Sequence, residues 1–263
     1  MEALAGELAP DAATALPPDV TNQVSGEDFL PNISGCRLRR SRGSAPCSGK
    51  TDSVDHLTVV DHPAVAHRLV ELRDADTEPD RFRTVLQEIS TLLAFVALAD
   101  LACSPVTVST PLAAAPGRRV SEAALLVPVL RAGLGMVPGV QYVIPRTQVA
   151  HLGMRRDEQT LDAVTYLDGL PSDLSGRRVV VLDPMLATGG SLTEACRLIR
   201  SRGAARVQVL CLVASRPGIE AFGRAHPEVP VTAAALDDTL NERGYIVPGL
   251  GDAGDRLFGP PPR

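Results

Sequence analysis

The second half of the chain alternates short apolar runs with helical stretches, and this pattern constrains the fold more than any other feature. Strands that are apolar along most of their length are typical of a parallel sheet covered by helices on both faces. We therefore expect an α/β fold, with ligands at the carboxyl ends of the strands. The predicted strands cover residues 125–130, 148–152, 179–182, 207–213 and 229–232, and the predicted helices cover 134–142, 191–201 and 218–226.

Upstream of this region the chain divides into two parts. Val65, Leu69 and Leu72 share one helical face, and residues 82–96 carry a longer amphipathic stripe. Residues 1–53 lack apolar periodicity and are interrupted by prolines, so they cannot bury enough apolar surface to offset their ordering entropy. We expect a disordered N-terminal extension over 1–53 and one folded domain over 54–263. The alternatives are a start codon assigned too far upstream and a basic recruitment arm.

Composition excludes several classes of function. The 26 Lys and Arg against 31 Asp and Glu leave a net charge of −5, and aromatic residues are only 3% with no Trp. This balance disfavours a dedicated nucleic-acid binder. The five cysteines show no C-x-x-C spacing, so no zinc knuckle or redox motif is indicated, and their odd number gives no disulfide framework. No apolar run is long enough to span a membrane and no secretory signal is present, and we expect a cytoplasmic protein.

The most informative segment runs from Val179 to Ser191. An apolar strand ends in Asp183, and a short turn then carries Thr188, two glycines and Ser191 into a helix. Glycines let backbone N–H groups approach an anion, and a helix N-terminus favours negative charge. We expect a phosphate monoester here, with Asp183 accepting hydrogen bonds from sugar hydroxyls. The alternative is a capped helix without a ligand, with Asp183 in a turn and Ser191 as the N-cap.

Three further loops carry charged residues. Arg131 follows the strand ending at Leu130 and is suited to a second anionic group, although a surface arginine beside a helix start is the simpler interpretation of this loop alone. Residues 153–160 contain two arginines that could reach a polyphosphate, although a solvated hairpin tip is the simpler interpretation. Residues 241–256 form a glycine-rich segment, which is either a structural turn or a support for a hydrated metal ion or a sugar hydroxyl through its acids.

Taken together, these segments resemble the uracil phosphoribosyltransferases. The resemblance runs from about Val59 to Phe258 and rests on collinear motifs at 130–136, 183–191 and 244–255. It implies a type I phosphoribosyltransferase-like fold, in which a mostly parallel sheet is flanked by helices, with N-terminal helices and a small C-terminal hood over about 236–258. It also implies conversion of uracil and 5-phospho-α-D-ribose 1-diphosphate to UMP and diphosphate, with Mg²⁺.

The resemblance also assigns roles to individual residues. It implies catalytic roles for Asp183, Arg131 and Arg156, and uracil binding by Ile246, Gly251, Asp252 and Ala253. No direct protein ligand of the metal is assigned. The residues implied in binding phosphoribosyl diphosphate are Arg131, Arg156, Asp183, Pro184, Met185, Leu186, Ala187, Thr188, Gly189, Gly190, Ser191 and Asp252.

One position departs from the family's pattern, because Arg155 stands where an aromatic residue is common. We align Arg156 as the functional arginine, since Asp157-Glu158-Gln159-Thr160 follows it directly. The resemblance further implies a homodimer or homotetramer and, as in some members, GTP as an effector, with no membrane or nucleic-acid partner. Two alternatives remain: a purine or orotate phosphoribosyltransferase, and a regulator that binds nucleotide and RNA.

Overall fold

The computed structural model describes residues 56–122, 124–156 and 163–259, apart from the side chains of Arg156 and Ala163. The prediction for residues 1–53 lies outside the described residues and stays a prediction. The helices and the 3₁₀ turn are α1 (Pro63–Arg73), α2 (Pro79–Ala97), η1 (Ala132–Met136), α3 (Val137–Val143), α4 (Gly190–Ser201), α5 (Arg216–Ala225) and α6 (Ala253–Phe258). The strands are β1 (Leu57–Val59), β2 (Cys103–Ser109), β3 (Ala114–Val120), β4 (Ala124–Leu130), β5 (Gln148–Val149), β6 (Leu152–Arg156), β7 (Ala163–Asp168), β8 (Arg178–Leu182), β9 (Met185–Leu186), β10 (Arg206–Ser215), β11 (Val231–Asp237), β12 (Thr239–Leu240) and β13 (Ile246–Val247).

The central sheet is mostly parallel, as predicted. Its order is β1-β11-β10-β8-β4-β6-β7, with β5 beside β4 and β9 beside β10. Only β7 runs antiparallel, pairing with β6 at one edge. The strands from β11 to β4 carry their apolar runs through the middle of the sheet, where both faces are buried.

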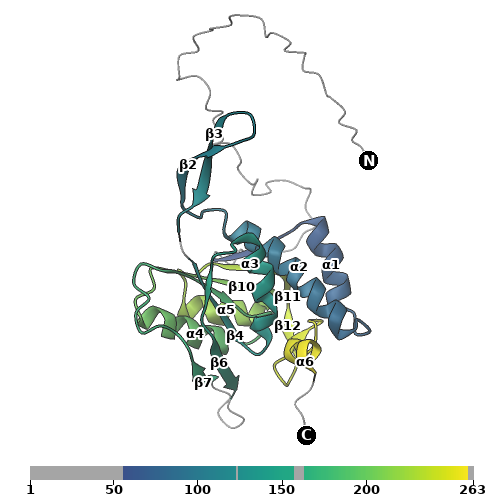
Figure 1. Cartoon of the computed structure of the whole chain (residues 1–263). Helices are drawn as coiled ribbons and strands as arrows, with labels where there is room; N and C mark the ends of the chain where they lie inside the picture. Colours follow the sequence, from purple (N-terminus) through teal and green to yellow (C-terminus); the bar gives the residue numbers. More distant parts are fainter. Residues whose placement is uncertain (1–55, 123, 157–162, 260–263) are drawn as a thin grey trace, which may run out of the picture. The chain divides into compact units, whose positions relative to one another are not determined.

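Helices cover both faces of the sheet, and each face has its own core (Figure 1). Alternating strand residues separate the two cores: Val180 and Leu182 pack with α1, α2, α3 and α6, whereas Val179 and Val181 pack with α4 and α5. This alternation follows from the two-residue period of a strand. The amphipathic stripe predicted over 82–96 becomes α2, whose Phe82, Val85, Leu86, Ile89 and Leu93 are fully buried.

The predicted boundaries differ most from the structure in three places. The single strand expected over 148–152 is divided into β5 and β6, because the chain leaves β4 after Val149 and rejoins it at Leu152. The strand expected over 229–232 begins at Val231 and extends to Asp237. The helix expected over 134–142 is a 3₁₀ turn followed by α3.

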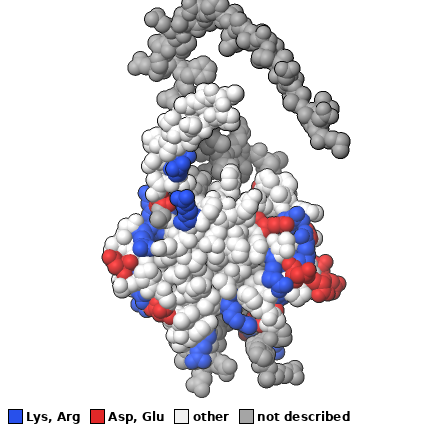
Figure 2. Space-filling model, viewed as in Figure 1, with Lys and Arg blue, Asp and Glu red and all other residues white. Residues whose placement is uncertain are grey.

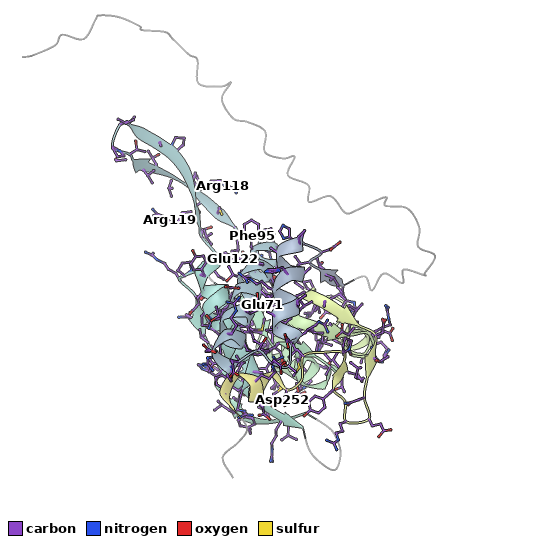
Figure 3. All side chains as sticks on the ribbon, turned by 90° about the vertical axis from the view of Figure 1, so that its right-hand side faces the viewer. Glu71, Phe95, Arg118, Arg119, Glu122 and Asp252 are labelled. Atoms are coloured by element: carbon purple, nitrogen blue, oxygen red, sulfur yellow. The ribbon has the colours of Figure 1, made fainter. Side chains whose placement is uncertain are left out.

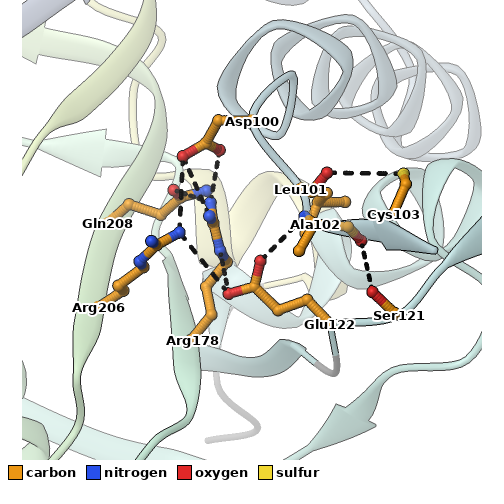
Figure 4. A network of polar contacts seen from close by, with 9 residues as sticks. All are labelled: Asp100, Leu101, Ala102, Cys103, Ser121, Glu122, Arg178, Arg206 and Gln208. Atoms are coloured by element: carbon orange, nitrogen blue, oxygen red, sulfur yellow. Dashed lines mark hydrogen bonds and ion pairs between the residues drawn. The ribbon is translucent and has the colours of Figure 1, made fainter.

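The β2–β3 hairpin was not predicted, and a buried arginine holds its base (Figure 4). Arg178, at the start of β8, is 2% exposed and donates to both carboxylate oxygens of Asp100 at 2.7 and 3.0 Å and to Glu122 at 3.0 Å. Asp100 precedes β2 and Glu122 follows β3, so Arg178 ties both ends of the hairpin to the sheet. This network lies at the edge of the sheet where β4 and β8 begin. A ligand site is expected at the opposite edge, where these strands end.

No helix in the described part of the chain is long and apolar enough to cross a membrane.

Candidate functional site

Two neighbouring parallel strands end side by side and bring two of the predicted loops together. β4 pairs with β8 up to Pro128 and Leu182, so Arg131 and Asp183 follow adjacent strand tips. Gly133 makes the contact between the two loops: a Cβ atom at this position would lie 2.1 Å from the carbonyl oxygen of Leu182. Only glycine allows this approach, and the two loops therefore meet as the sequence predicted.

Asp183 stands at the tip of β8 as expected. Its Oδ1 accepts a hydrogen bond from Met185 N at 3.2 Å, which folds the start of the loop. Burial raises the pKa of the Asp183 carboxyl to about 7, and the Met185 hydrogen bond offsets this only in part. The residue still keeps some exposed surface. Among the described residues no cation pairs with Asp183, and a desolvated carboxylate of this kind is suited to accept hydrogen bonds from a ligand.

The loop after Asp183 encloses a hollow of about 60 Å³, lined by residues 183 and 185–192. About two water molecules take up this volume in liquid water. The hollow can therefore hold one phosphate group but not a whole nucleotide. Gly189, with φ of 83°, is the N-cap of α4, and no side chain caps this helix. The alternative in which Ser191 is the N-cap is therefore wrong, because Ser191 already lies in the first turn. The N-terminus of α4 opens into the hollow, as an anion site requires.

The hollow is supported from behind by α5. The hydroxyl of Ser215, a fully buried residue, donates to the carbonyl oxygen of Ala187 at 2.5 Å and accepts from Gly218 N at 2.9 Å. A Cβ atom on Gly218 would lie 2.0 Å from the same Ala187 oxygen. The loop is thus packed directly on the first turn of α5, which fixes its backbone.

A glycine pair in this loop gives a stability prediction. In Gly189→Ala the backbone of an alanine must adopt a positive φ, and its Cβ would lie 2.9 Å from Gly218 O. We expect a loss of about 2–3 kcal/mol in the free energy of unfolding. The matched control is Gly190→Ala, where the nearest atom is 3.9 Å away and φ is not positive. Urea denaturation checks both; equal stability of the two variants would contradict the loop geometry.

Arg131 and the C-terminal segment also meet, at Gly254. Arg131 Nη2 donates to Asp255 Oδ1 at 2.8 Å, and both side chains are more than 40% exposed. A Cβ atom on Gly254 would lie 3.2 Å from Asp252 Oδ1 and 3.5 Å from Arg131 Nη2. Asp252 also caps α6 by accepting from Asp255 N at 2.9 Å. Figure 3 places Asp252 at the end of the molecule opposite Glu122 and the hairpin.

The structure describes only part of the segment over residues 153–160, which carries Arg155 and Arg156. Arg156 ends β6, which lies beside β4, but its side chain is outside the described residues, as are residues 157–160. The antiparallel pairing of β6 with β7 agrees with the hairpin interpretation. Arg155 is exposed. The assignment of Arg156 as the functional arginine stays a prediction.

The residues implied in uracil binding lie on β13, in the loop that follows it and at the start of α6. Ile246 and Ala253 are buried, whereas Gly251 is exposed at φ of 77° and Asp252 is half-buried. The predicted hood comprises the end of β11, β12, β13 and α6. Its backbone at Gly251 is accessible next to Asp252, which is what recognition by main-chain groups needs.

The carboxylates at the site do not form a metal cage. Among the described residues, no group of three or more His, Cys, Asp or Glu side chains could hold an ion. Mg²⁺ commonly binds through one or two carboxylates together with substrate phosphates. The available carboxylates, Asp183, Asp252 and Asp255, fit a metal that arrives with a diphosphate rather than one held by protein alone.

The two histidines that precede prolines, His62 and His226, have structural roles. His62 caps α1 by accepting from Ala64 N at 3.1 Å. His226 ends α5, is 8% exposed, and its Nε2 lies 3.0 Å from the carbonyl oxygen of Thr193. Neither lies at the strand tips, so neither is a general base for the site.

Sequence reasoning missed the residues that support the site from a distance. Asp255, the partner of Arg131, was not assigned, and neither were Arg73 and Asp237, which hold the loop before α6. No local signal marks the latter pair, because 164 residues separate them.

Larger cavities of about 710 and 560 Å³ lie elsewhere, between α1, α2 and α3 and at the hairpin base, and contain none of the predicted site residues.

Comparison with known proteins gives a consistent result. The family model described as uracil phosphoribosyltransferase matches residues 59–260. The uracil phosphoribosyltransferase of Kineococcus radiotolerans is 53% identical over 207 residues, covering 77% of this chain and 98% of its own. That of Halalkalibacterium halodurans is 48% identical, covering 76% and 97%. The solved structure of the AQ2163 protein from Aquifex aeolicus aligns with a TM-score of 0.73 at 36% identity, covering 77% and 98%.

Proposed function

The chain belongs to the uracil phosphoribosyltransferase family, and on this premise we propose how its own residues carry out the reaction. The protein transfers the phosphoribosyl group of 5-phospho-α-D-ribose 1-diphosphate to uracil, giving UMP and diphosphate in pyrimidine salvage. The fold agrees with the type I phosphoribosyltransferases, with the ligand end at the carboxyl edge of the sheet.

The observation that carries the assignment of roles is the meeting of three segments. The Arg131 loop contacts the tip of β8 through Gly133, and the Arg131 guanidinium lies against Gly254 beside Asp252. A phosphate-sized hollow, an arginine and a base-reading loop therefore share one end of the sheet. We assign the 5′-phosphate to residues 187–191, the ribose hydroxyls to Asp183, and the diphosphate to Arg131 and Arg156.

The chemistry needs little proton transfer. The bond between C1′ and the diphosphate oxygen breaks, a bond from C1′ to uracil N1 forms, and the N1 proton is released. Positive charge develops on the ribose while negative charge grows on the leaving group, and Arg131 is placed to stabilise the latter. The loop and the strand tip hold the sugar in position for attack. Mg²⁺ bound with the diphosphate would neutralise further charge on the leaving group.

We propose that Arg131 exchanges Asp255 for the diphosphate during the cycle. Its ion pair with Asp255 is largely exposed, and exposed pairs contribute only about 0–1 kcal/mol. A diphosphate oxygen can therefore replace Asp255 at little cost. The ion pair keeps the guanidinium near the site in the free protein, which reduces the entropy lost on binding.

The assignment of Arg156 gives a second prediction. We expect Arg156→Ala to raise KM for phosphoribosyl diphosphate by about tenfold or more, because a charge-assisted hydrogen bond is lost. Arg155→Ala is the matched control and should change this KM by less than about threefold, because Arg155 is exposed and the alignment does not assign it to the diphosphate. Steady-state kinetics with varied phosphoribosyl diphosphate measure both. The reverse order would refute the alignment.

Assembly, regulation and location remain proposals. From the resemblance to the family we propose a homodimer or homotetramer in the cytoplasm, with GTP as an effector. Sedimentation of the purified protein tests the oligomeric state, and repeating it with GTP tests whether GTP acts on the assembly. On the face shown in Figure 2, basic side chains gather near the base of the β2–β3 hairpin, and basic and acidic side chains are mixed elsewhere. The net charge of −5 supports an enzyme rather than an RNA-binding regulator.

The experiment that tests the function is a steady-state assay of the purified protein with phosphoribosyl diphosphate and Mg²⁺. Uracil, cytosine, hypoxanthine and orotate are offered separately. We expect turnover with uracil at a kcat/KM well above that for the other bases. Preferred use of hypoxanthine or orotate would replace this proposal with the purine or orotate alternative.

A further inference from the structure

The loop that precedes α6, residues 246–252, is held by an ion pair between two distant parts of the chain. Arg73 at the end of α1 and Asp237 at the end of β11 form a bidentate pair, with Nη1–Oδ2 and Nη2–Oδ1 distances of 2.8 and 2.7 Å. Asp237 is only 8% exposed, so water competes little for it. A paired, planar contact of this kind fixes orientation as well as distance.

Both residues of the pair also bind the main chain of one loop residue. Gly249 N donates to Asp237 Oδ2 at 2.9 Å, and Arg73 Nη1 donates to Gly249 O at 2.9 Å. Both backbone polar groups of Gly249 are thus engaged by the same ion pair. A carboxylate or a guanidinium alone would satisfy one group and leave the other without its partner.

The backbone conformation of Gly249 also restrains the residues that precede it in the loop. Its φ is 60°, and a Cβ atom there would lie 2.2 Å from the carbonyl oxygen of Ile246. The loop therefore turns back tightly on the residue to which uracil binding is assigned. On the other side, Arg256 Nη1 donates to Leu250 O at 3.0 Å and to Leu72 O at 2.6 Å. The end of α1 is thus joined to Gly249 through Arg73 and, through Arg256, to the following residue Leu250.

From these contacts we propose that Arg73 and Asp237 are positioning residues for uracil: they touch no substrate and set the backbone of residues 246–252 that reads the base. The inference rests on the proposed function, because it presupposes that this loop binds uracil. A site that recognises a base through main-chain groups cannot be adjusted by its own side chains, so the loop must be positioned from outside. Within the described part of the chain, neither residue of the pair forms a hydrogen bond or ion pair with residues 183–191, so we expect the phosphate site to depend on it little.

The test is Asp237→Asn, which retains the size of the side chain and removes its charge. We expect KM for uracil to rise by about tenfold or more, with KM for phosphoribosyl diphosphate and kcat changed by less than about threefold. Asp238→Asn is the matched control, since Asp238 is exposed, pairs with Arg216 and does not contact the loop. Its kinetics should equal those of the unaltered protein.

Two further measurements keep the outcome decisive. Arg73→Lys retains the charge but loses the bidentate contact, and we expect a smaller rise in the uracil KM. This variant carries the test if Asp237→Asn does not fold. An unchanged uracil KM in the folded variants, or an equal rise in both KM values, would overturn the positioning role. The unaltered protein is assayed first, so that a failure to make UMP counts against the proposed function and not against the ion pair.

Discussion

Replacing Asp183 by Asn is expected to lower kcat/KM by about 100-fold or more while making the protein more stable at pH 8. The loss of activity follows because hydrogen bonds to a charged acceptor contribute about 1.5–3 kcal/mol each, and the ribose offers two hydroxyls. The amide oxygen of Asn can still accept from Met185 N, which donates to Asp183 at 3.2 Å, so the loop should keep its fold.

The gain in stability follows from the sign of the pKa change. Folding raises the pKa of Asp183 from 3.8 to about 7. A carboxyl with a raised pKa contributes full stability below its unfolded pKa and loses it as pH rises towards the folded value. Between pH 5 and pH 7 the unaltered protein should lose about 2–3 kcal/mol that Asp183→Asn retains. Chemical denaturation at pH 5 and pH 8 measures the difference.

The chain offers a matched control for this variant. Asp173 also accepts from the backbone N–H two residues on, Ser175 N at 2.8 Å, but it is exposed, and hydrogen bonds from Ser175 lower its pKa. Asp173→Asn should keep full activity and should gain no stability at pH 8. Unfolding of Asp183→Asn, or a stability advantage that does not grow with pH, would mean that Asp183 serves packing rather than substrate.

The second large effect is expected from Gly133→Ala. The added Cβ would lie 2.1 Å from Leu182 O and 3.3 Å from the carbonyl carbon of Pro128, and these backbone atoms cannot rotate away. The tips of β4 and β8 must separate, which we expect to cost about 3 kcal/mol of unfolding free energy. Because Arg131 and Asp183 stand on these tips, kcat/KM should fall by more than about tenfold at temperatures where the variant is folded.

The control is Gly117→Ala in the β2–β3 hairpin, where the nearest atom to an added Cβ is 3.6 Å away. Its unfolding free energy should change by less than about 0.5 kcal/mol. Thermal unfolding and steady-state kinetics compare the two variants. A Gly133→Ala protein with normal stability and activity would show that the two loops do not meet as described.

Much of the fold could be predicted because its signals are local. The apolar runs of β4, β8 and β10 and the stripe of α2 are each readable within one segment. Asp183 and Arg131 could be placed because parallel strands deliver the residues after them to one edge of the sheet. The β2–β3 hairpin was missed because β2 and β3 pair only with each other, and their exposed residues lack a buried face and its alternating pattern.

The support of the site could not be predicted, for a physical reason. Arg73 and Asp237 lie in segments that carry no motif, and their contact exists only after α1 packs beside β11. The pairing of Arg131 with Asp255 spans 124 residues in the same way. The sequence shows that position 133 is a glycine but not why a glycine is required there. The reason is the carbonyl oxygen of Leu182 at the end of the neighbouring strand β8. Such roles depend on tertiary contacts that no spacing along the chain encodes.

The most direct measurement is a crystal structure of the protein with phosphoribosyl diphosphate and Mg²⁺. The account predicts a single bound molecule, with its 5′-phosphate against the backbone of residues 187–191, its ribose hydroxyls at Asp183 and its diphosphate at Arg131 in place of Asp255. A molecule seated away from the ends of β4 and β8, for instance beside Arg118 at the hairpin base, would contradict it.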